Sequence, residues 1–477
     1  MTNRKYRLIL TAITAAVLVY VMMRAYFIPI THDEAYSFHN MKRFWYAEAL
    51  CTGNTHWLNS MALKVAILLQ QESVFALRWF SLLSATVFFW ITWQWAKSKT
   101  NFVSALFVLS VCLLNPYVLD YFSIARGYAS GLLFESLSLL FFFRTTGPQK
   151  KGSSFLSLLF AGLAAISNFS FFYFFVAFSS VYFTRTHFLK GITFVKTKEF
   201  YRDSFFVSIV SLLVARALLF ITRCSNDVVG AGTQEFSEFC AVFTEGLFQL
   251  TSRPESPIML GSKWAACTLI ILSTLSGLLP GKKTSAPLHY YAALILLCEF
   301  ILIFSGHFFF QFVLPASRSA LFLFPLTVVC FVEFLESLSA TTIVKKMTLL
   351  TGSVFLIVNF LLHYNSTSVV DYHAQADLKK GMDFLEKNGA VRVGMGTEVY
   401  GGFRNYFQMT EKYNYSFAGE ELRSRTSGAG GPTPTDLSHC DFLIVVPPYD
   451  LTDYRCQKKL SAAKFFPQTG TLILKVD

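Results

Sequence analysis

Two adjacent carboxylates, Asp33 and Glu34, follow directly on the first apolar run of the chain, in the stretch THDEAYSFHN. A carboxylate at the edge of an apolar segment can serve as a general base that takes a proton from a hydroxyl or amine nucleophile. The second carboxylate can orient that nucleophile or hold a cation. A plainer alternative is that both acids begin the next helix, because negative charge is favourable at a helix N-terminus.

Two arginines are candidates for binding an anionic group. Arg126 lies in LNPYVLDYFSIARGYASG and Arg318 in LPASRSALFLFPL, each beside the end of an apolar run. A guanidinium group gives bidentate, charge-assisted hydrogen bonds to phosphate oxygens, so both are candidates for a phosphate site. Their ordinary alternative is that the long side chain reaches the membrane interface from a helix end.

A third arginine, Arg216, lies inside an apolar run, SLLVARALLFITRC. An ionisable residue at membrane depth is a candidate functional residue. It can contact a lipid phosphate, or it can pair with a buried acid, for which Glu135 and Glu299 are the candidates at membrane depth. The sequence favours the structural ion pair.

The elements that must position these residues are membrane-spanning helices, as the composition indicates. Of the 477 residues, 53% are hydrophobic and only 15% are charged. Soluble domains keep about a quarter of their residues charged. The net charge of +12 therefore does not indicate a nucleic-acid partner. In a membrane protein, basic residues mostly mark the loops that stay in the cytoplasm.

The apolar runs predict an all-α polytopic membrane protein with about eleven transmembrane helices. The basic N-terminus and the long apolar core of the first run indicate a retained helix rather than a cleaved signal. The predicted helices fall near residues 8–28, 74–95, 102–119, 127–143, 154–167, 169–184, 204–222, 264–279, 288–306, 318–337 and 347–363.

The orientation follows from the charges of the loops. If the N-terminus is cytoplasmic, every second loop is cytoplasmic too, and each of these loops carries Lys or Arg, as the positive-inside bias requires. Acidic residues, Asp33 and Glu34 among them, lie in the outer loops. An odd number of helices places the C-terminus outside the cytoplasm.

Two parts of the chain differ in composition. Residues 1–363 form the predicted membrane domain, whose first outer loop is 31–73. Residues 364–477 are polar and punctuated by Gly and Pro, and they predict a small extracytoplasmic α/β domain. Its strands are expected in VRVGMGTEVY, CDFLIVVPPYD and GTLILKVD, and an amphipathic helix is expected in ADLKKGMDFLEKNG. A Cys440–Cys456 disulfide is compatible with an oxidising outside, although spacing alone does not assign it.

The order of these motifs resembles the GT-C superfamily of integral-membrane glycosyltransferases. The resemblance rests on the acidic pair after the first helix, the NTHWLNS segment, NPYVLDYFSIARGY and RSALFLFPL. The bacterial branch related to protein mannosyltransferases and aminoarabinose transferases is the most similar in this respect. The resemblance covers nearly the whole predicted membrane part.

Particular residue roles are implied by this resemblance. Asp33 corresponds to the general base, assisted by Glu34, and Arg126 and Arg318 correspond to the candidate contacts of a donor phosphate. Arg216 is a third candidate contact because of its membrane depth rather than the resemblance. The pocket and the acceptor would be contacted by His32, His56, Asn59 and Tyr128. Many relatives have an acidic residue two positions before the arginine of the second motif, where this sequence has Ile124.

The expected function is the transfer of a sugar from a polyprenyl-phosphate donor to an extracytoplasmic acceptor, which is a lipid, glycan or protein. The resemblance also implies a bacterial inner membrane. No spacing of candidate metal ligands in the sequence assigns a cofactor. The sequence does not decide whether the protein uses a divalent cation. The alternatives are a transporter or flippase of a lipid-linked or small polar solute, a polysaccharide polymerase or ligase, and a membrane scaffold without catalysis.

Overall fold

The computed structural model describes most of the chain. The described residues are 3–43, 56–71, 73–146, 154–190, 195–224, 232–233, 257–278, 286–315, 317–338, 342–369, 372, 376–395, 416–417, 435–436, 440–445, 454–455, 460–467 and 471–476. The chain divides into two compact units. Unit 1 comprises Met1–Met22, Leu50–Ala62 and Arg78–Tyr364, and unit 2 comprises Met23–Ala49, Leu63–Leu77 and Asn365–Asp477.

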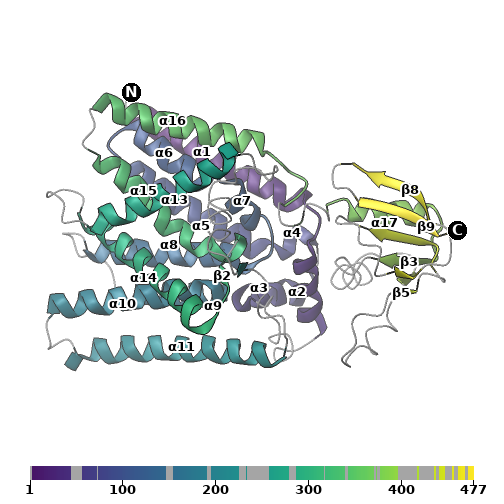
Figure 1. Ribbon diagram of the computed structural model, residues 1–477, viewed down its shortest axis with the longest axis horizontal. Helices are drawn as coiled ribbons and strands as arrows, with labels where there is room; N and C mark the ends of the chain where they lie inside the picture. Colours follow the sequence, from purple (N-terminus) through teal and green to yellow (C-terminus); the bar gives the residue numbers. More distant parts are fainter. Residues whose placement is uncertain are drawn as a thin grey trace. The chain divides into compact units, whose positions relative to one another are not determined.

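Unit 1 is a bundle of long helices (Figure 1). Its helices are most of α1 (Asn3–Phe27), the start of α3 (Trp57–Leu68), α5 (Trp79–Ser98), α6 (Phe102–Leu113), α7 (Pro116–Phe122), α8 (Gly127–Thr146), α9 (Ser154–Ser167), α10 (Phe172–Lys190), α11 (Lys198–Cys224), α13 (Pro257–Leu278), α14 (Ala286–Phe310), α15 (Phe324–Ser337) and α16 (Thr342–Leu362). The described part of unit 1 also contains two short 3-10 helices, η2 (Phe169–Phe171) and η4 (Ser317–Leu323), and one pair of two-residue strands, β1 (Gly232–Thr233) and β2 (Leu314–Pro315).

Each of the eleven predicted apolar segments corresponds to a helix of this bundle, or to two consecutive helices. Within the described residues, four helices are long and apolar enough to cross a membrane, and the bent pair α6 and α7 makes a fifth if it is one span. The helices of that pair meet at 58°, directly before Pro116. The chain is therefore an integral membrane protein, and the number of eleven spans stays a prediction.

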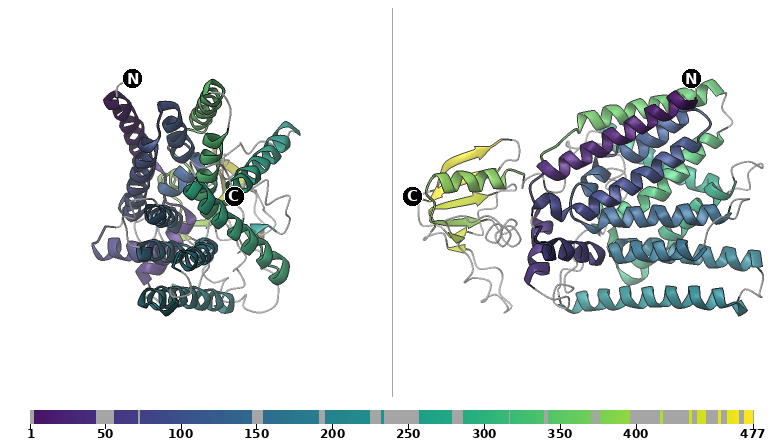
Figure 2. Two further views of the ribbon diagram at one scale, coloured as in Figure 1. Left: turned by 90° about the vertical axis from the view of Figure 1, so that its left-hand side faces the viewer. Right: turned by 180° about the vertical axis from the view of Figure 1, so that it is seen from behind.

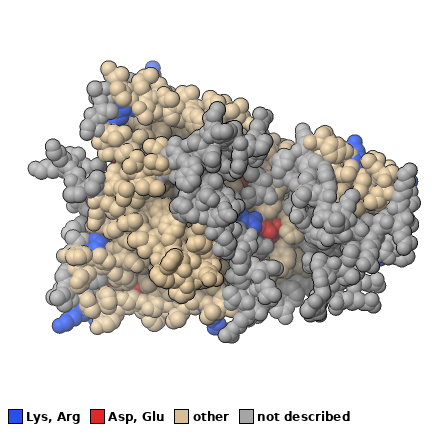
Figure 3. Space-filling view, in the orientation of Figure 1, with Lys and Arg blue, Asp and Glu red and all other residues tan. Residues whose placement is uncertain are grey.

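The surface of the bundle is apolar, as expected for a protein in lipid. Charged side chains are sparse on the face of unit 1 that Figure 3 shows. Helices α9, α10 and α11 run alongside one another (Figure 2). Small residues permit close packing here: a Cβ added at Gly162 of α9 would meet the ring of Phe206 in α11 at 2.8 Å.

The C-terminal part of unit 2 is an α/β fold built on a five-stranded sheet with the order β4-β3-β6-β9-β8. The strands are β3 (Arg392–Met395), β4 (Ser416–Phe417), β6 (Phe442–Val445), β8 (Leu460–Phe466) and β9 (Thr471–Val476). Strand β3 is parallel to β4 and β6, whereas β9 is antiparallel to β6 and β8. Two further short strands, β5 (Thr435–Asp436) and β7 (Tyr454–Arg455), pair with each other.

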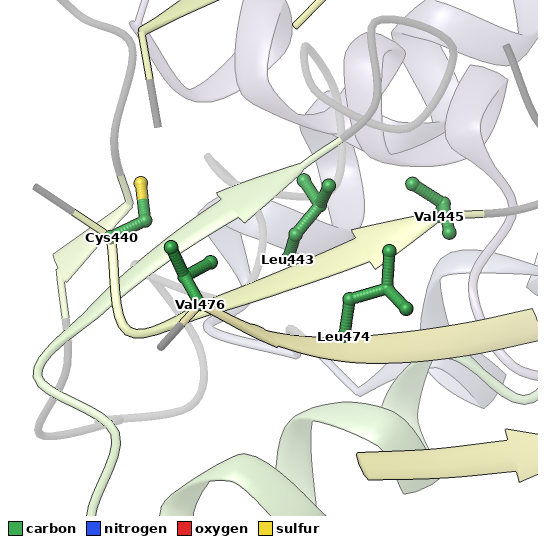
Figure 4. Packing of buried hydrophobic residues seen from close by; sticks show 5 residues of the cluster. All are labelled: Cys440, Leu443, Val445, Leu474 and Val476. Carbon is green, nitrogen blue, oxygen red and sulfur yellow. The ribbon is translucent and has the colours of Figure 1, made fainter. Parts of the chain in front are cut away.

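A small apolar core stabilises this sheet. Five residues of β6, β9 and the segment two positions before β6 are buried together: Cys440, Leu443, Val445, Leu474 and Val476 (Figure 4). Helix α17 (Leu378–Lys387) packs against β9, with Gly381 facing Ile473. The predicted α/β character of this region is confirmed. Cys456 lies outside the described residues, so the disulfide stays a prediction.

Candidate functional site

The first turn of helix α2 (His32–Arg43) determines where the acidic pair lies. Thr31 precedes this helix and its hydroxyl accepts a hydrogen bond from the backbone N–H of Glu34 at 3.3 Å. In return, Glu34 Oε2 accepts one from the N–H of Thr31 at 2.9 Å. This reciprocal arrangement is a capping box, for which the Thr-x-x-Glu sequence is a signature. The Glu34 carboxylate therefore holds the backbone on which Asp33 is mounted.

Asp33 has a different partner from its neighbour. The phenol of Tyr372 donates a hydrogen bond to Asp33 Oδ2 at 2.5 Å, across a sequence separation of 339 residues. Asp33 is 5% exposed and Tyr372 is 8% exposed. His32, the other sequence candidate on this turn, is half-buried. The two adjacent carboxylates thus have different roles. Glu34 caps the N-terminus of α2, and Asp33 accepts a hydrogen bond from the phenol of Tyr372.

Tyr372 was not among the candidates that the sequence offered. It lies in the segment after α16, in a part of the chain predicted to belong to a separate domain. Arg24, at the end of the first apolar run, fixes the beginning of this segment. Its guanidinium group donates hydrogen bonds to the carbonyl of Asn365 at 2.5 Å and to that of Ser368 at 2.9 Å. Arg24, at the end of the first apolar run, was the one residue in the sequence that could have indicated a contact with this segment.

A second cluster of sequence candidates lies in unit 1, around the start of α8. The ring of His56 meets that of Tyr128 edge-on, with centroids 5.3 Å apart. Asn59 donates a hydrogen bond from Nδ2 to the carbonyl of Ala125 at 2.8 Å. The backbone before α8 is thereby held by a side chain from α3. His56, Asn59 and Tyr128 are all buried, and the structure brings them together.

Gly127 makes this packing feasible. A Cβ at this position would lie 2.1 Å from the carbonyl oxygen of Ser167 and 2.7 Å from Cβ of His56. Backbone cannot give way as a flexible side chain can. The glycine of the Arg-Gly-Tyr motif is therefore required for the contact of α8 with residues 56 and 167.

We expect Gly127→Ala to destabilise the protein by about 1–3 kcal/mol, because extra volume in a packed interior forces neighbouring atoms apart. The measurement is thermal unfolding of the purified protein in detergent. Gly306→Ala in α14 is the matched control, since its nearest contact is the exposed ring of Phe312 at 3.2 Å. Equal unfolding temperatures for Gly127→Ala and the unaltered protein would contradict the packing argument.

Arg126 lies between α7 and α8 and is 2% exposed. Arg318 lies in η4, is half-buried, and packs with that helix against α8 and η2. Phe171 of η2 links the two regions: it contacts Phe322 of η4, and a Cβ at Gly131 of α8 would collide with its ring. The structure thus places Arg318 on an element that packs near the first turns of α8.

Arg216 does not form the predicted ion pair. Its side chain on α11 is exposed. Glu135 of α8 and Glu299 of α14 are completely buried. Within the described part of the chain, no oxygen of either carboxyl has a hydrogen-bond partner. The predicted pairing of Arg216 with Glu135 or Glu299 is therefore wrong. The contradiction has a physical reason: Arg216 occupies the outward face of its helix.

The candidates thus divide between the two units. Asp33, Glu34 and His32 belong to unit 2 together with Tyr372, whereas Arg126, Arg318, Arg216, His56, Asn59 and Tyr128 belong to unit 1. Among the described residues, no group of three or more His, Cys, Asp or Glu side chains has the arrangement of a metal site.

The fold of this chain is similar to that of a solved membrane protein. That structure is described as ArnT from Cupriavidus metallidurans bound to undecaprenyl phosphate. The similarity supports the resemblance that the sequence shows, at the level of the fold. Its TM-score is 0.52 and its sequence identity is 9%, and the match covers 98% of this chain and 97% of ArnT. No family model and no curated protein sequence matches the chain.

Proposed function

We propose that this protein transfers a sugar from a polyprenyl-phosphate donor to an acceptor on the extracytoplasmic side of the membrane. The observation that carries the proposal is the similarity of nearly the whole chain to ArnT, whose crystal structure contains undecaprenyl phosphate. The buried Asp33 at the start of α2 supports it, because an acidic residue after the first helix is where the resemblance places the base. The protein is then a GT-C transferase of the cell envelope with a cytoplasmic N-terminus.

The residues of this chain have distinct roles in the proposed reaction. Asp33 accepts the proton of the acceptor hydroxyl or amine as that atom attacks the anomeric carbon of the sugar. The bond between this carbon and the phosphate oxygen breaks, and polyprenyl phosphate leaves. Glu34 assists by holding the first turn of α2 through the capping box. A charge-assisted hydrogen bond from a guanidinium group stabilises the leaving phosphate, and Arg126 and Arg318 are assigned this role.

The experiment that tests the proposal measures donor consumption, because this readout does not require the acceptor to be known. The purified protein in nanodiscs is incubated with undecaprenyl-phosphate sugars and membrane extract, and released undecaprenyl phosphate is quantified by mass spectrometry. Native mass spectrometry then measures binding of undecaprenyl phosphate. We expect both release and binding.

A phosphatidic acid of matched charge is the control for this experiment. It presents the same phosphate without a polyprenyl chain, so equal binding of both lipids would show that the site does not recognise the donor. Absence of undecaprenyl phosphate binding, together with no consumption of any donor, would contradict the proposed function.

A second candidate function is transport or flipping of a lipid-linked or small polar solute. The buried pair Glu135 and Glu299 favours it, because ionisable residues at membrane depth often mark a polar pathway. Translocation of a fluorescent undecaprenyl-phosphate derivative across proteoliposomes, lost in Glu135→Gln, would support this function instead. Donor consumption with no translocation would exclude it.

A further inference from the structure

The segment after the last helix of the bundle contributes to the environment of Asp33. Tyr372 donates to Asp33 Oδ2, and both side chains are buried. A narrow pocket beside this pair is lined by residues 28–31 and 367–369, Tyr372 and Ala376. Residues that follow α16 therefore lie against residues that follow α1, although the sequence separates them by the whole bundle.

The position of Tyr372 is itself determined by several hydrogen bonds. Arg24, only 1% exposed, binds the carbonyls of Asn365 and Ser368. The side chain of Asn365 closes a turn by accepting from the backbone N–H groups of Thr367 and Ser368 at 2.8 and 3.1 Å. The N–H of Tyr372 then bonds to the carbonyl of Val369 at 3.0 Å. These contacts link the end of α1 to the turn at Asn365 and to the backbone of Tyr372.

Asp33 is consequently fixed at two levels. The capping box of Thr31 and Glu34 holds its backbone, and Tyr372 holds its carboxylate. A catalytic group gains from such support, since a group held in its productive orientation need not be ordered during the reaction. A buried tyrosine hydroxyl usually finds a hydrogen-bond partner, and for Tyr372 that partner is the carboxylate of the proposed base.

We propose that Tyr372 is a positioning residue for the general base, and that the Arg24 contacts with residues 365 and 368 hold it in place. This inference rests on the proposed function and deepens it. It assigns part of the catalytic site to the segment that leads into the C-terminal α/β domain. Tyr372 acts through Asp33 and is not itself required to touch the sugar.

The test compares Tyr372→Phe, Asp33→Asn and the double variant in the donor-consumption assay. Tyr372→Phe removes only the hydroxyl. We expect kcat to fall about tenfold, with KM for the donor changed less than twofold, because a hydrogen bond to a charged group is lost while the binding groups are untouched. On the Asp33→Asn background, Tyr372→Phe is expected to cause no further loss.

Tyr182→Phe is the matched control. Tyr182 of α10 donates to the buried Asp203 of α11 at 2.7 Å, so it forms the same kind of pair away from Asp33. It should leave kcat within about twofold. Arg24→Gln should lower kcat as Tyr372→Phe does, and thermal unfolding identifies any variant that fails to fold.

The outcomes separate the two proposals. An unchanged or increased kcat in Tyr372→Phe, with Asp33→Asn inactive, would overturn the positioning role and leave the proposed function standing. Additive losses in the double variant would also overturn it, because they would show that Tyr372 acts independently of Asp33. Full activity of Asp33→Asn would overturn the general-base assignment itself.

Discussion

Asp33→Asn is expected to lower kcat for sugar transfer by at least about 100-fold, the lower end of what a general base contributes. The substitution preserves shape and leaves an oxygen that can accept the hydrogen bond from Tyr372. It removes only the ability to take a proton. The measurement is single-turnover release of undecaprenyl phosphate from an undecaprenyl-phosphate sugar, which separates chemistry from product release.

The control for this prediction is Asp203→Asn. Asp203 is as buried as Asp33 and also accepts from a tyrosine, but it forms an ion pair with Arg202 at 2.7 Å and lies on α11. This variant is expected to lose stability while keeping kcat within about threefold. Retention of full activity by Asp33→Asn would remove the proposed base.

The second large effect is expected for Arg126→Gln, which should weaken binding of undecaprenyl phosphate by about 10–100-fold. This range corresponds to about 1.5–3 kcal/mol for a hydrogen bond to a charged group. Glutamine keeps a donor at the end of the side chain but loses the charge and the bidentate geometry. The measurement is titration of undecaprenyl phosphate by native mass spectrometry.

Arg144→Gln is the matched variant for this titration. Arg144 lies in the last turn of α8, the helix that follows Arg126, and its side chain is exposed. It should bind undecaprenyl phosphate as the unaltered protein does. Equal affinities in the two variants would mean that Arg126 has a structural role at the junction of α7 and α8.

The apolar runs predicted the helices of unit 1 because a membrane helix must hide its backbone polar groups over a fixed length. The same signal could not detect the helices of the first outer loop. Helix α2, HDEAYSFHNMKR, is polar and short, and its start is visible only in the Thr-x-x-Glu cap. The acidic pair was open to two interpretations, and the structure shows that the cap applies to Glu34.

The contacts of the site were beyond prediction because they join distant segments. Arg24, Tyr372 and Asp33 have no common pattern in the sequence, and spacing says nothing about a separation of 339 residues. The ion pair predicted for Arg216 was wrong for a related reason. Hydropathy gives the depth of a residue in the membrane but not the face of the helix that it occupies. Strand β8, LSAAKFF, was missed because Ala and Lys interrupt its alternation.

The contacts between the region after α1 and the segment after α16 join residues far apart in the sequence, which has a consequence for biosynthesis. Asp33 is made within the first tenth of the chain, whereas Tyr372 and Asn365 leave the ribosome only after the bundle helices have been synthesised. Contacts between such distant segments are among the last to form. A nascent chain that already spans the membrane thus has its acidic pair without the phenol. On the positioning role proposed for Tyr372, full transferase activity arises only when synthesis has passed the last membrane helix, so partial chains would consume little of the lipid-linked sugar.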